Sequence, residues 1–146
     1  MNINIQRLPH AADLPLPAYA TTGSAGLDLH AAIPTDLIIG SGKRVLVPTG
    51  FAIQLPQGYE AQIRSRSGLA LKHGLFVLNS PATIDSDYRG EIFVLIMNTG
   101  DEAFVITPGM RFAQMIITTY TTAAFCEVDS LTETERGSGK FGSTGV

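Results

Sequence analysis

One stretch of the chain combines arginine, serine and glycine in a way that suits phosphate binding. RSRSGLA, residues 64–70, places Arg66, Ser67 and Gly68 where a short helix would begin. Backbone N–H groups at a helix start, with an arginine beside them, bind phosphate oxygens. The alternative is a helix start capped by serine, with Arg64 and Arg66 as solvated surface residues.

The C-terminal stretch RGSGKFGSTGV, residues 136–146, has the same chemistry. Its four glycines leave little to bury, so we expect a mobile tail after a folded domain of residues 1–135. Phe141 is a lone aromatic residue in a segment that cannot form a core. The candidate phosphate ligands of the tail, which are an arginine, two hydroxyls and glycine amides, are Arg136, Gly142, Ser143 and Thr144. The alternative is a disordered terminus without a role.

The stretch TIDSDYRGE, residues 83–91, holds more charge than a turn requires. A hairpin needs only Asn-Gly or Asp-Gly. With LFVLNSPA before it and IFVLIM after it, the stretch predicts two apolar strands joined by a polar hairpin whose concave side could hold a flat ring. The candidate lining residues are Asn79, Pro81, Thr83 and Ile84. The alternative is a solvated hairpin tip in which Asp85 forms an Asx-turn.

Two further stretches place polar groups on apolar strands. In AGLDLHA, residues 25–31, alternation turns Asp28 away from the face that buries its two leucine neighbours. In GMRFAQM, residues 109–115, Arg111 and Gln114 stand at the start of a strand, where a tight bend could bring both near a pocket. The alternatives are an ordinary outward carboxylate and a strand that merely follows a turn.

Short β-type runs separated by glycine and proline must position these groups. The predicted strands are 3–6, 27–32, 44–55, 59–64, 75–78, 91–97, 103–106, 111–120 and 125–128. Only residues 68–74, GLALKHG, read as a short helix, ended by glycine. The sequence therefore predicts an all-β fold, a jelly-roll-like barrel or sandwich with one short helix.

Composition excludes several classes of function. The formal net charge of −3 gives no basic stripe of the kind that neutralises a nucleic-acid backbone, so we expect no polymer partner. Cys126 is the only cysteine, which excludes an intrachain disulfide and suits a reducing compartment. No window reaches the ~18 apolar residues of a membrane span, so we expect a cytoplasmic protein without a membrane partner.

In their order and spacing, the five stretches resemble the five motifs of the trimeric deoxyuridine triphosphatases (dUTP diphosphatases). The resemblance runs from about Ala25 to the C-terminus, and its core is IDSDYRGE together with the tail. It implies an Mg²⁺-dependent enzyme that hydrolyses dUTP to dUMP and pyrophosphate. Such an enzyme keeps uracil out of DNA and supplies dUMP for thymidylate synthesis.

For the hairpin, the resemblance implies a uracil pocket. The backbone of Thr83 and Ile84, with Asn79, would match the base as a pairing partner does and leave no room for a methyl group at C5. Phe93 would add a backbone contact, and Tyr88 would pack under a deoxyribose that lacks the 2′-hydroxyl. The same resemblance makes Asp85 the general base that takes a proton from the water attacking the α-phosphorus.

For the remaining stretches, the resemblance implies a triphosphate site. Ser67 and the Gly68 amide would hold phosphate oxygens, Arg66 would order their surroundings, and Gln114 would reach the phosphates. Asp28 would support Mg²⁺, mostly through water, which fits a hard cation that keeps much of its hydration shell.

The resemblance also implies a homotrimer with shared active sites. The hairpin, the phosphate loop and the tail would come from different subunits, with Asp87 and Arg89 as structural groups or intersubunit partners. The tail would close over the nucleotide, with Phe141 stacked on the uracil and Arg136 at the γ-phosphate.

The chain departs from the family pattern at three positions. Ser65 replaces a proline often found before the arginine of the phosphate stretch. Met110 stands where an aspartate is common, and Lys140 stands where glycine is common.

Two other functions are compatible with parts of this sequence. A dCTP deaminase would share the β-fold, but it needs a carboxylate or a metal-bound water near C4 of the base, and the chain offers no His/Cys zinc set. A non-catalytic trimer that binds nucleotide and signals to a protein partner is the other alternative, and the presence of both Asp85 and Asp28 argues against it.

Overall fold

The computed structural model of the chain describes residues 1–140. The strands in this part are β1 (Asn4–Arg7), β2 (Ala18–Tyr19), β3 (Leu27–His30), β4 (Leu37–Ile39), β5 (Arg44–Pro48), β6 (Phe51–Gln54), β7 (Tyr59–Ser65), β8 (Leu75–Val77), β9 (Ala82–Ile84), β10 (Phe93–Asn98), β11 (Phe104–Ile106) and β12 (Arg111–Thr119). A 3-10 turn, η1 (Pro9–Ala11), and one helix, α1 (Ser67–His73), complete them. The prediction of a jelly-roll-like all-β fold with one short helix is confirmed.

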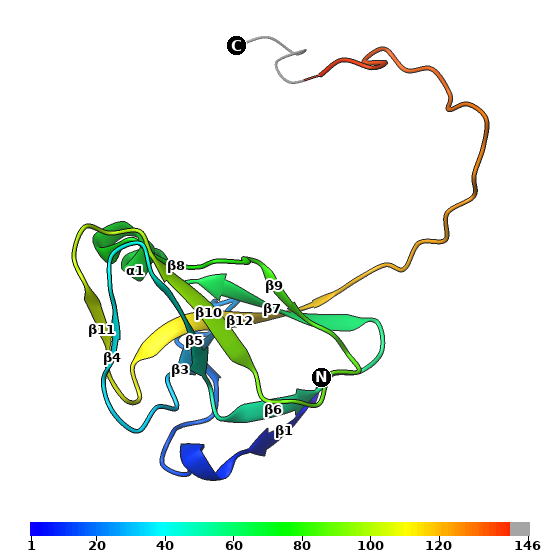
Figure 1. Cartoon of the computed structure of the whole chain (residues 1–146). Coiled ribbons are helices and arrows are strands. Elements are labelled where there is room, and N and C mark those ends of the chain that lie inside the picture. The colour runs from blue at the N-terminus through cyan, green and yellow to red at the C-terminus, as the bar shows by residue number, and fades with distance from the viewer. Residues whose placement is uncertain (141–146) are drawn as a thin grey trace.

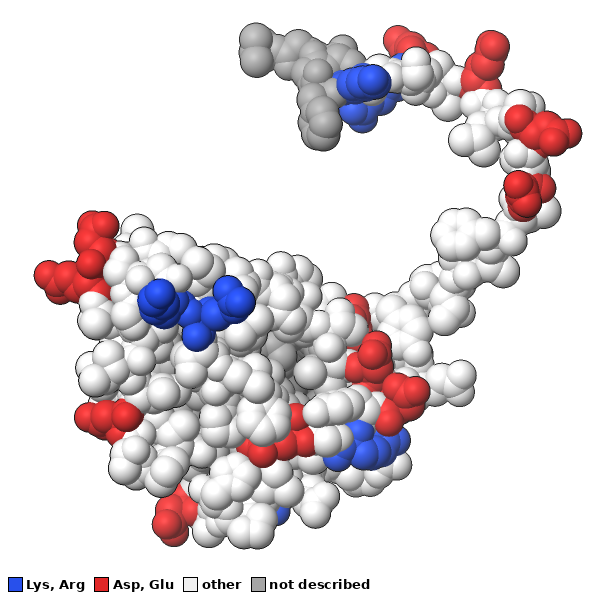
Figure 2. All heavy atoms as spheres, in the orientation of Figure 1, with Lys and Arg blue, Asp and Glu red and all other residues white. Residues whose placement is uncertain are grey.

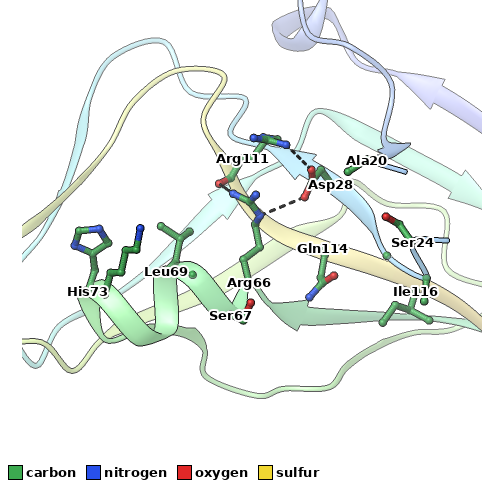
Figure 3. A pocket seen from close by; sticks show the side chains of 14 residues that line it. Ala20, Ser24, Asp28, Arg66, Ser67, Leu69, His73, Arg111, Gln114 and Ile116 are labelled. Carbon is green, nitrogen blue, oxygen red and sulfur yellow. Dashed lines mark hydrogen bonds and ion pairs between the residues drawn. The ribbon is translucent and has the colours of Figure 1, made fainter. Parts of the chain in front are cut away.

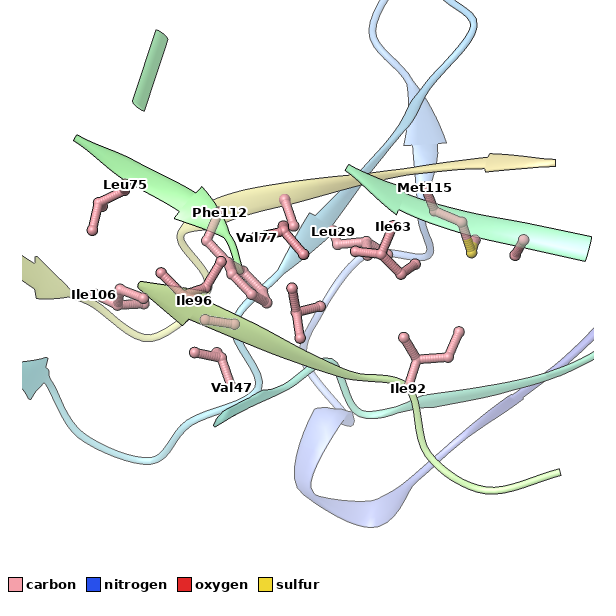
Figure 4. Close-up of a cluster of buried hydrophobic side chains, with 14 of the residues drawn as sticks. Leu29, Val47, Ile63, Leu75, Val77, Ile92, Ile96, Ile106, Phe112 and Met115 are labelled. Carbon is pink, nitrogen blue, oxygen red and sulfur yellow. The ribbon is translucent and has the colours of Figure 1, made fainter. Parts of the chain in front are cut away.

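The strands form small sheets around one core (Figure 1). A five-stranded sheet has the order β2-β3-β12-β7-β9, a three-stranded sheet has the order β5-β10-β8, and β1-β6 and β11-β4 form two ribbons. Their inward side chains meet in one apolar cluster (Figure 4). Leu29 and Ile63 come from the larger sheet, Val47 and Val94 from the smaller one, and Ile106 from a ribbon. Each is at most 1% exposed, so the strands are fixed by burial on one face.

The predicted strand 44–55 was wrong as one unit. It is two strands, β5 and β6, separated by Thr49 and Gly50. Gly50 has φ +74, and a Cβ there would lie 2.1 Å from the Cβ of Ala11. The chain therefore turns at the one residue that fits both the left-handed backbone and the close approach of η1. The turn moves β6 out of the sheet of β5 and pairs it with β1.

Strand β12 is the element that organises the site. It pairs antiparallel with β3 on one side and with β7 on the other. The register places Gln114 opposite Asp28 and Arg64, and an irregularity follows Arg111. Because a bulge redirects side chains, the predicted bend near Arg111 and Gln114 is present as a break in the ladder.

The predicted hairpin crosses between sheets. Strand β8 pairs with β10, as the two apolar runs predicted, with Val77 opposite Ile96. The segment between them contains β9, which sequence reasoning did not anticipate, and β9 pairs with β7 through Ile84 and Ala61. The hairpin is therefore anchored to both sheets before its charged tip begins.

The last strand predicted, 125–128, is absent from the described structure. The chain leaves the body after β12, and residues 121–140 run away from it without a strand (Figure 1). Phe125 is fully exposed. The apolar residues of the segment suit a strand, but within residues 1–140 no sheet edge pairs with it, and an unpaired strand is not stable.

The visible surface carries little charge. On the face in Figure 2, most atoms belong to neither Lys, Arg, Asp nor Glu, and the charged side chains lie in small separate groups. Among the described helices, none is long and apolar enough to cross a membrane.

Candidate active site

The phosphate stretch and its partners line one open cavity of about 600 Å³. Strand β3, strand β12 and the start of α1 form its walls (Figure 3). The predicted site residues that it brings together are Asp28, Arg66, Ser67, Gly68 and Gln114, together with Arg111. Residues from three of the predicted stretches, far apart in sequence, therefore share one site.

Asp28 lies between two arginines. Its Oδ1 is 3.2 Å from Nε of Arg66, and its Oδ2 is 2.9 Å from Nη1 of Arg111. Arg66 also donates from Nη1 to the carbonyl of Arg111 at 2.8 Å. The side chain of Asp28 is 17% exposed and that of Arg66 is 29% exposed, so this pair is screened less than a fully exposed one. Asp28 is therefore not an ordinary outward carboxylate, and the guanidinium of Arg66 is not freely solvated.

The start of α1 is open towards the cavity. Arg66, not a serine, occupies the N-cap position, and it has extended backbone angles and no capping side chain. Ser67 and Gly68 are the first helical residues, where backbone N–H groups have no partner inside the helix. The alternative of a serine cap is wrong. At the other end, Gly74 ends the helix with φ 65, as its position after GLALKH predicted.

Gln114 is held in one orientation. Its Nε2 donates to the carbonyl of Ser65 at 2.8 Å. Its Oε1 lies 2.3 Å from the point where Gly26 would carry a Cβ. Glycine at that position leaves the space that the amide occupies.

The charged hairpin lines a different cavity, of about 610 Å³. Asp85 is exposed there, and within residues 1–140 its carboxylate accepts no hydrogen bond and forms no ion pair. The turn is closed instead by the backbone, where the N–H of Tyr88 donates to the carbonyl of Asp85 at 3.2 Å. The Asx-turn alternative is wrong, because the carboxylate does not close the turn.

The rest of the hairpin is braced internally. Arg89 donates to the carbonyls of Ser86 and Tyr88 at 2.7 and 2.8 Å. The hydroxyl of Tyr88 donates to the carbonyl of Glu91 at 2.9 Å. The carboxylate of Glu91 accepts the N–H of Gly50 at 2.7 Å and contacts Nε2 of His10 at 2.9 Å. These contacts hold the loop while leaving Asp85 free.

Within one chain the two cavities do not merge. Ile84, next to Asp85, pairs with Ala61 on β7, and Ser65, four residues further along the same strand, directly precedes Arg66 and the start of α1. At about 3.3 Å per strand residue, these points are about 13 Å apart. The general-base candidate, which follows β9, and the phosphate candidates, which follow β7 or lie on β12, thus lie beside different parts of β7.

A family model described as dUTPase matches residues 12–145. The chain belongs to the dUTPase family. A curated deoxyuridine 5'-triphosphate nucleotidohydrolase of Mesorhizobium japonicum is 59% identical, over 99% of this chain and 91% of that protein. The enzyme of the same name from Rhizobium etli is 56% identical, over 99% of this chain and 94% of that protein.

Solved dUTPase structures share the fold. The Staphylococcus bacteriophage 80alpha dUTPase, solved with dUpNHpp, superposes with a TM-score of 0.88 at 23% identity, over 99% of each chain. A mutant dUTPase of phage phi11 of S. aureus, described as revealing the coordination of a structural Mg(II) ion, superposes with a TM-score of 0.80 at 19% identity, over 91% of this chain and all of that one.

The other predicted site residues do not come together in one site within the described chain. Asn79 and Thr83 are exposed, and Phe93 is 43% exposed on the return strand. Arg136 is exposed on the segment that leaves the body. The predicted tail residues Phe141, Gly142, Ser143 and Thr144 lie outside the described residues.

Sequence reasoning missed several lining residues. Ser24, Lys72 and His73 line the phosphate cavity, and Tyr120 lines the hairpin cavity. Lys72 and His73 stand in the helix that was predicted, four residues after Gly68 and Leu69, so a helical projection from those two residues could have indicated them. Tyr120 carried no signal, because its place depends on where β12 ends against β7.

A buried histidine nitrogen lies beside the charge cluster. His30 follows Asp28 on the same face of β3, and its Nδ1 is buried with no hydrogen-bond partner in residues 1–140. Burial lowers the pKa of His30 below 6.5, and the cations Arg111 and Arg66 act in the same direction against the opposing effect of Asp28. Burial therefore favours the neutral imidazole beside the charge cluster.

Proposed function

We propose that this chain hydrolyses dUTP to dUMP and pyrophosphate, with Asp85 as the general base. The observation that carries the assignment is the free carboxylate of Asp85, which lines a cavity on a loop braced by Arg89 and Glu91. A general base needs an unpaired carboxylate within reach of its water, on a loop that does not move away. Asp85 would take a proton from the water that attacks the α-phosphorus.

Uracil and deoxyribose selection would fall to the same hairpin. Asn79 and the backbone of Thr83 and Ile84 would bind the base edge, with a further backbone contact from Phe93, and a methyl group at C5 would meet the backbone. Tyr88 is 43% exposed with its hydroxyl tied back to the loop, which leaves one ring face for a sugar without a 2′-hydroxyl. Arginine and serine would play no part in base selection.

The triphosphate would occupy the cavity at the start of α1. Ser67 and the Gly68 amide supply donors, Gln114 supplies an amide N–H, and Arg66 is fixed by Asp28 beside them. Arg136, Gly142, Ser143 and Thr144 of the tail would complete the anion site, and Phe141 would cover the base. Donors fixed in advance act on the charge that develops at phosphorus without reorganisation.

Asp28 fits a supporting role towards Mg²⁺. Both of its oxygens already face arginines, and residues 1–140 contain no group of three or more His, Cys, Asp or Glu side chains that could hold a metal. We therefore assign Asp28 an outer position, through water, with the nucleotide supplying the inner ligands. The bound ion would neutralise triphosphate charge.

A homotrimer with shared sites would join the two cavities. The outward face of the β5-β10-β8 sheet exposes Leu46 at 54% and Phe93 at 43%, and the departing segment exposes Phe125 and Leu131 at 100% and 87%. Large exposed apolar side chains of this kind mark surfaces that assemble. The distance between Asp85 and the phosphate stretch along β7 supports the same proposal.

The substitution Asp85→Asn tests the assignment of the base. It keeps shape and removes the proton acceptor, so we expect turnover to fall roughly 10²- to 10⁴-fold with nucleotide affinity retained. Asp87→Asn is the matched control, since it makes the same change two residues away and should retain most of the turnover. Normal turnover in Asp85→Asn would refute the assignment.

A substrate panel tests the rest of the proposal. Pyrophosphate release should occur with dUTP and Mg²⁺, and fail with dTTP, dCTP, UTP or EDTA. Ammonia release from dCTP would favour a deaminase, and nucleotide binding without any release would favour a non-catalytic sensor. A solution mass of one chain by light scattering would refute the trimer.

A further inference from the structure

We propose that Ser65 is a positioning residue for the triphosphate, acting through the phosphate loop and Gln114. The inference rests on the proposed function. Ser65 is the last residue of β7 and directly precedes Arg66, Ser67 and Gly68. It is half-buried, its side chain bonds Val77 on β8, and its carbonyl holds Gln114, which lines the phosphate cavity.

The Ser65 hydroxyl joins the two main sheets. Its Oγ accepts the backbone N–H of Val77, on β8, at 2.9 Å. Val77 is fully buried, and the next residue, Leu78, donates to Leu95 of β10 on the other side. Successive N–H groups of a strand point in opposite directions, so the Val77 N–H faces β7. Strands β7 and β8 share no backbone hydrogen-bond ladder within residues 1–140. At this point the Ser65 hydroxyl accepts the N–H that a neighbouring strand's carbonyl would otherwise accept.

The Ser65 carbonyl fixes the amide of Gln114. A backbone carbonyl can only accept, so the atom facing it at 2.8 Å must be Nε2, the donor. Oε1 then lies over Gly26, where glycine leaves room for it. One N–H of Nε2 is used by Ser65, and the second remains for a phosphate oxygen. The orientation of the predicted phosphate ligand is therefore set by Ser65.

The two contacts act together. If the hydroxyl is lost, the buried Val77 N–H has no partner and the end of β7 loses its tie to β8. The carbonyl that orients Gln114 belongs to the same residue. A shift of this strand end therefore moves the amide of Gln114 together with the start of α1 at Ser67 and Gly68. A proline at this position would keep the carbonyl and lack the hydroxyl, so it would preserve only one of the two contacts.

The expected signature is a defect in triphosphate binding. Ser65 meets the hairpin at the Val77 N–H of β8, and it makes no hydrogen bond to Asp85 or to the charged tip within residues 1–140. Ser65→Ala should therefore raise KM for dUTP about 5-fold, the equivalent of about 1 kcal/mol, with little change in kcat. Affinity for dUpNHpp should fall by the same factor. Inhibition by 2′-deoxyuridine, which has the base and sugar without phosphate, should not change.

The experiment compares four full-length chains: wild type, Ser65→Ala, Ser65→Thr and Thr99→Ala. Threonine keeps the hydroxyl and should restore wild-type KM. Thr99→Ala is the matched control, because its hydroxyl donates to the carbonyl of Gly74 at 2.8 Å, at the far end of α1. Amide exchange should speed up at Val77 in Ser65→Ala and not in Thr99→Ala.

The outcomes separate this inference from the proposed function. Wild-type turnover of dUTP with an unchanged KM in Ser65→Ala would overturn the Ser65 inference alone. Equal weakening of dUpNHpp and 2′-deoxyuridine, or the same loss in Thr99→Ala, would also overturn it, because either result reports a general loss of structure. A wild-type chain that neither binds nor hydrolyses dUTP would overturn both proposals.

Discussion

Gly26→Ala should weaken triphosphate binding without unfolding the protein. The added Cβ would lie 2.3 Å from Oε1 and 3.2 Å from Cδ of Gln114, which is about 1 Å short of ordinary contact for the oxygen. The nearest atom is the free end of a flexible side chain, so the amide moves and the backbone stays. A movement of about 1 Å takes Nε2 out of hydrogen-bond range of the Ser65 carbonyl, now at 2.8 Å.

The size of the effect follows from the bonds lost. One neutral hydrogen bond contributes about 1 kcal/mol, and one to a charged phosphate about 1.5–3 kcal/mol. If Gln114 binds phosphate, losing that contact raises KM for dUTP roughly 10- to 100-fold. The free energy of unfolding should fall by only about 1 kcal/mol, because the moved amide is near the surface of an open cavity.

Steady-state kinetics and urea unfolding measure the two quantities. Gly23→Ala is the matched control, because a Cβ at Gly23 meets nothing within 4 Å and the substitution lies three residues earlier in the same loop. It should leave both KM and the unfolding midpoint close to wild type. A Gly26→Ala chain with wild-type KM would refute the view that the Gln114 amide is held in a functional position.

Two further predictions concern stability. The side chain of Asn98 is fully buried and makes three hydrogen bonds: it donates to the carbonyls of Ile39 and Glu102 and accepts the N–H of Gly100. Asn98→Ala should therefore lower the free energy of unfolding in urea by about 3 kcal/mol or more. Asn4→Ala, at an exposed position, should lower it little. The pKa of His30 is lowered in the folded chain, so below pH 6.5 the unfolded chain binds a proton more readily than the folded chain does. The free energy of unfolding should therefore fall as the pH falls below 6.5. Between pH 7.5 and 5.5, urea unfolding should show a smaller loss of that free energy in His30→Asn than in wild type.

Much of the fold could be predicted from local pattern. Alternation in LDLH predicts a strand that buries one face, and β3 confirms it. The largely apolar run RFAQMIITT predicts a strand without a clean alternation, and β12 confirms the strand. The short strands β2, β4 and β9 were missed. Strands β8 and β11 are as short as β4 and β9 but were found, so length alone does not decide whether a strand can be predicted. The break at Gly50 was missed because the runs on both sides are apolar, and only contact with Ala11 shows why the chain must turn there.

The arrangement of the candidate site could be predicted less well from the sequence pattern. Each stretch could be assigned its chemistry, but the ion pairs of Asp28 with Arg66 and Arg111 depend on the order β3-β12-β7, which joins strands distant in sequence. Segment 125–128 shows the opposite case. Its apolar residues are right for a strand, yet strand formation needs a neighbouring edge, and the rest of the described chain provides none.

The separation of the two cavities along β7 has a genetic consequence. If sites are shared between chains, a copy damaged in the hairpin and a copy damaged in the phosphate loop are not equivalent defects. Mixed in one assembly, they can pair an intact hairpin with an intact loop and restore activity that neither has alone. Two inactive alleles of this gene would then complement each other in the same cell, whereas two alleles damaged in the same cavity would not.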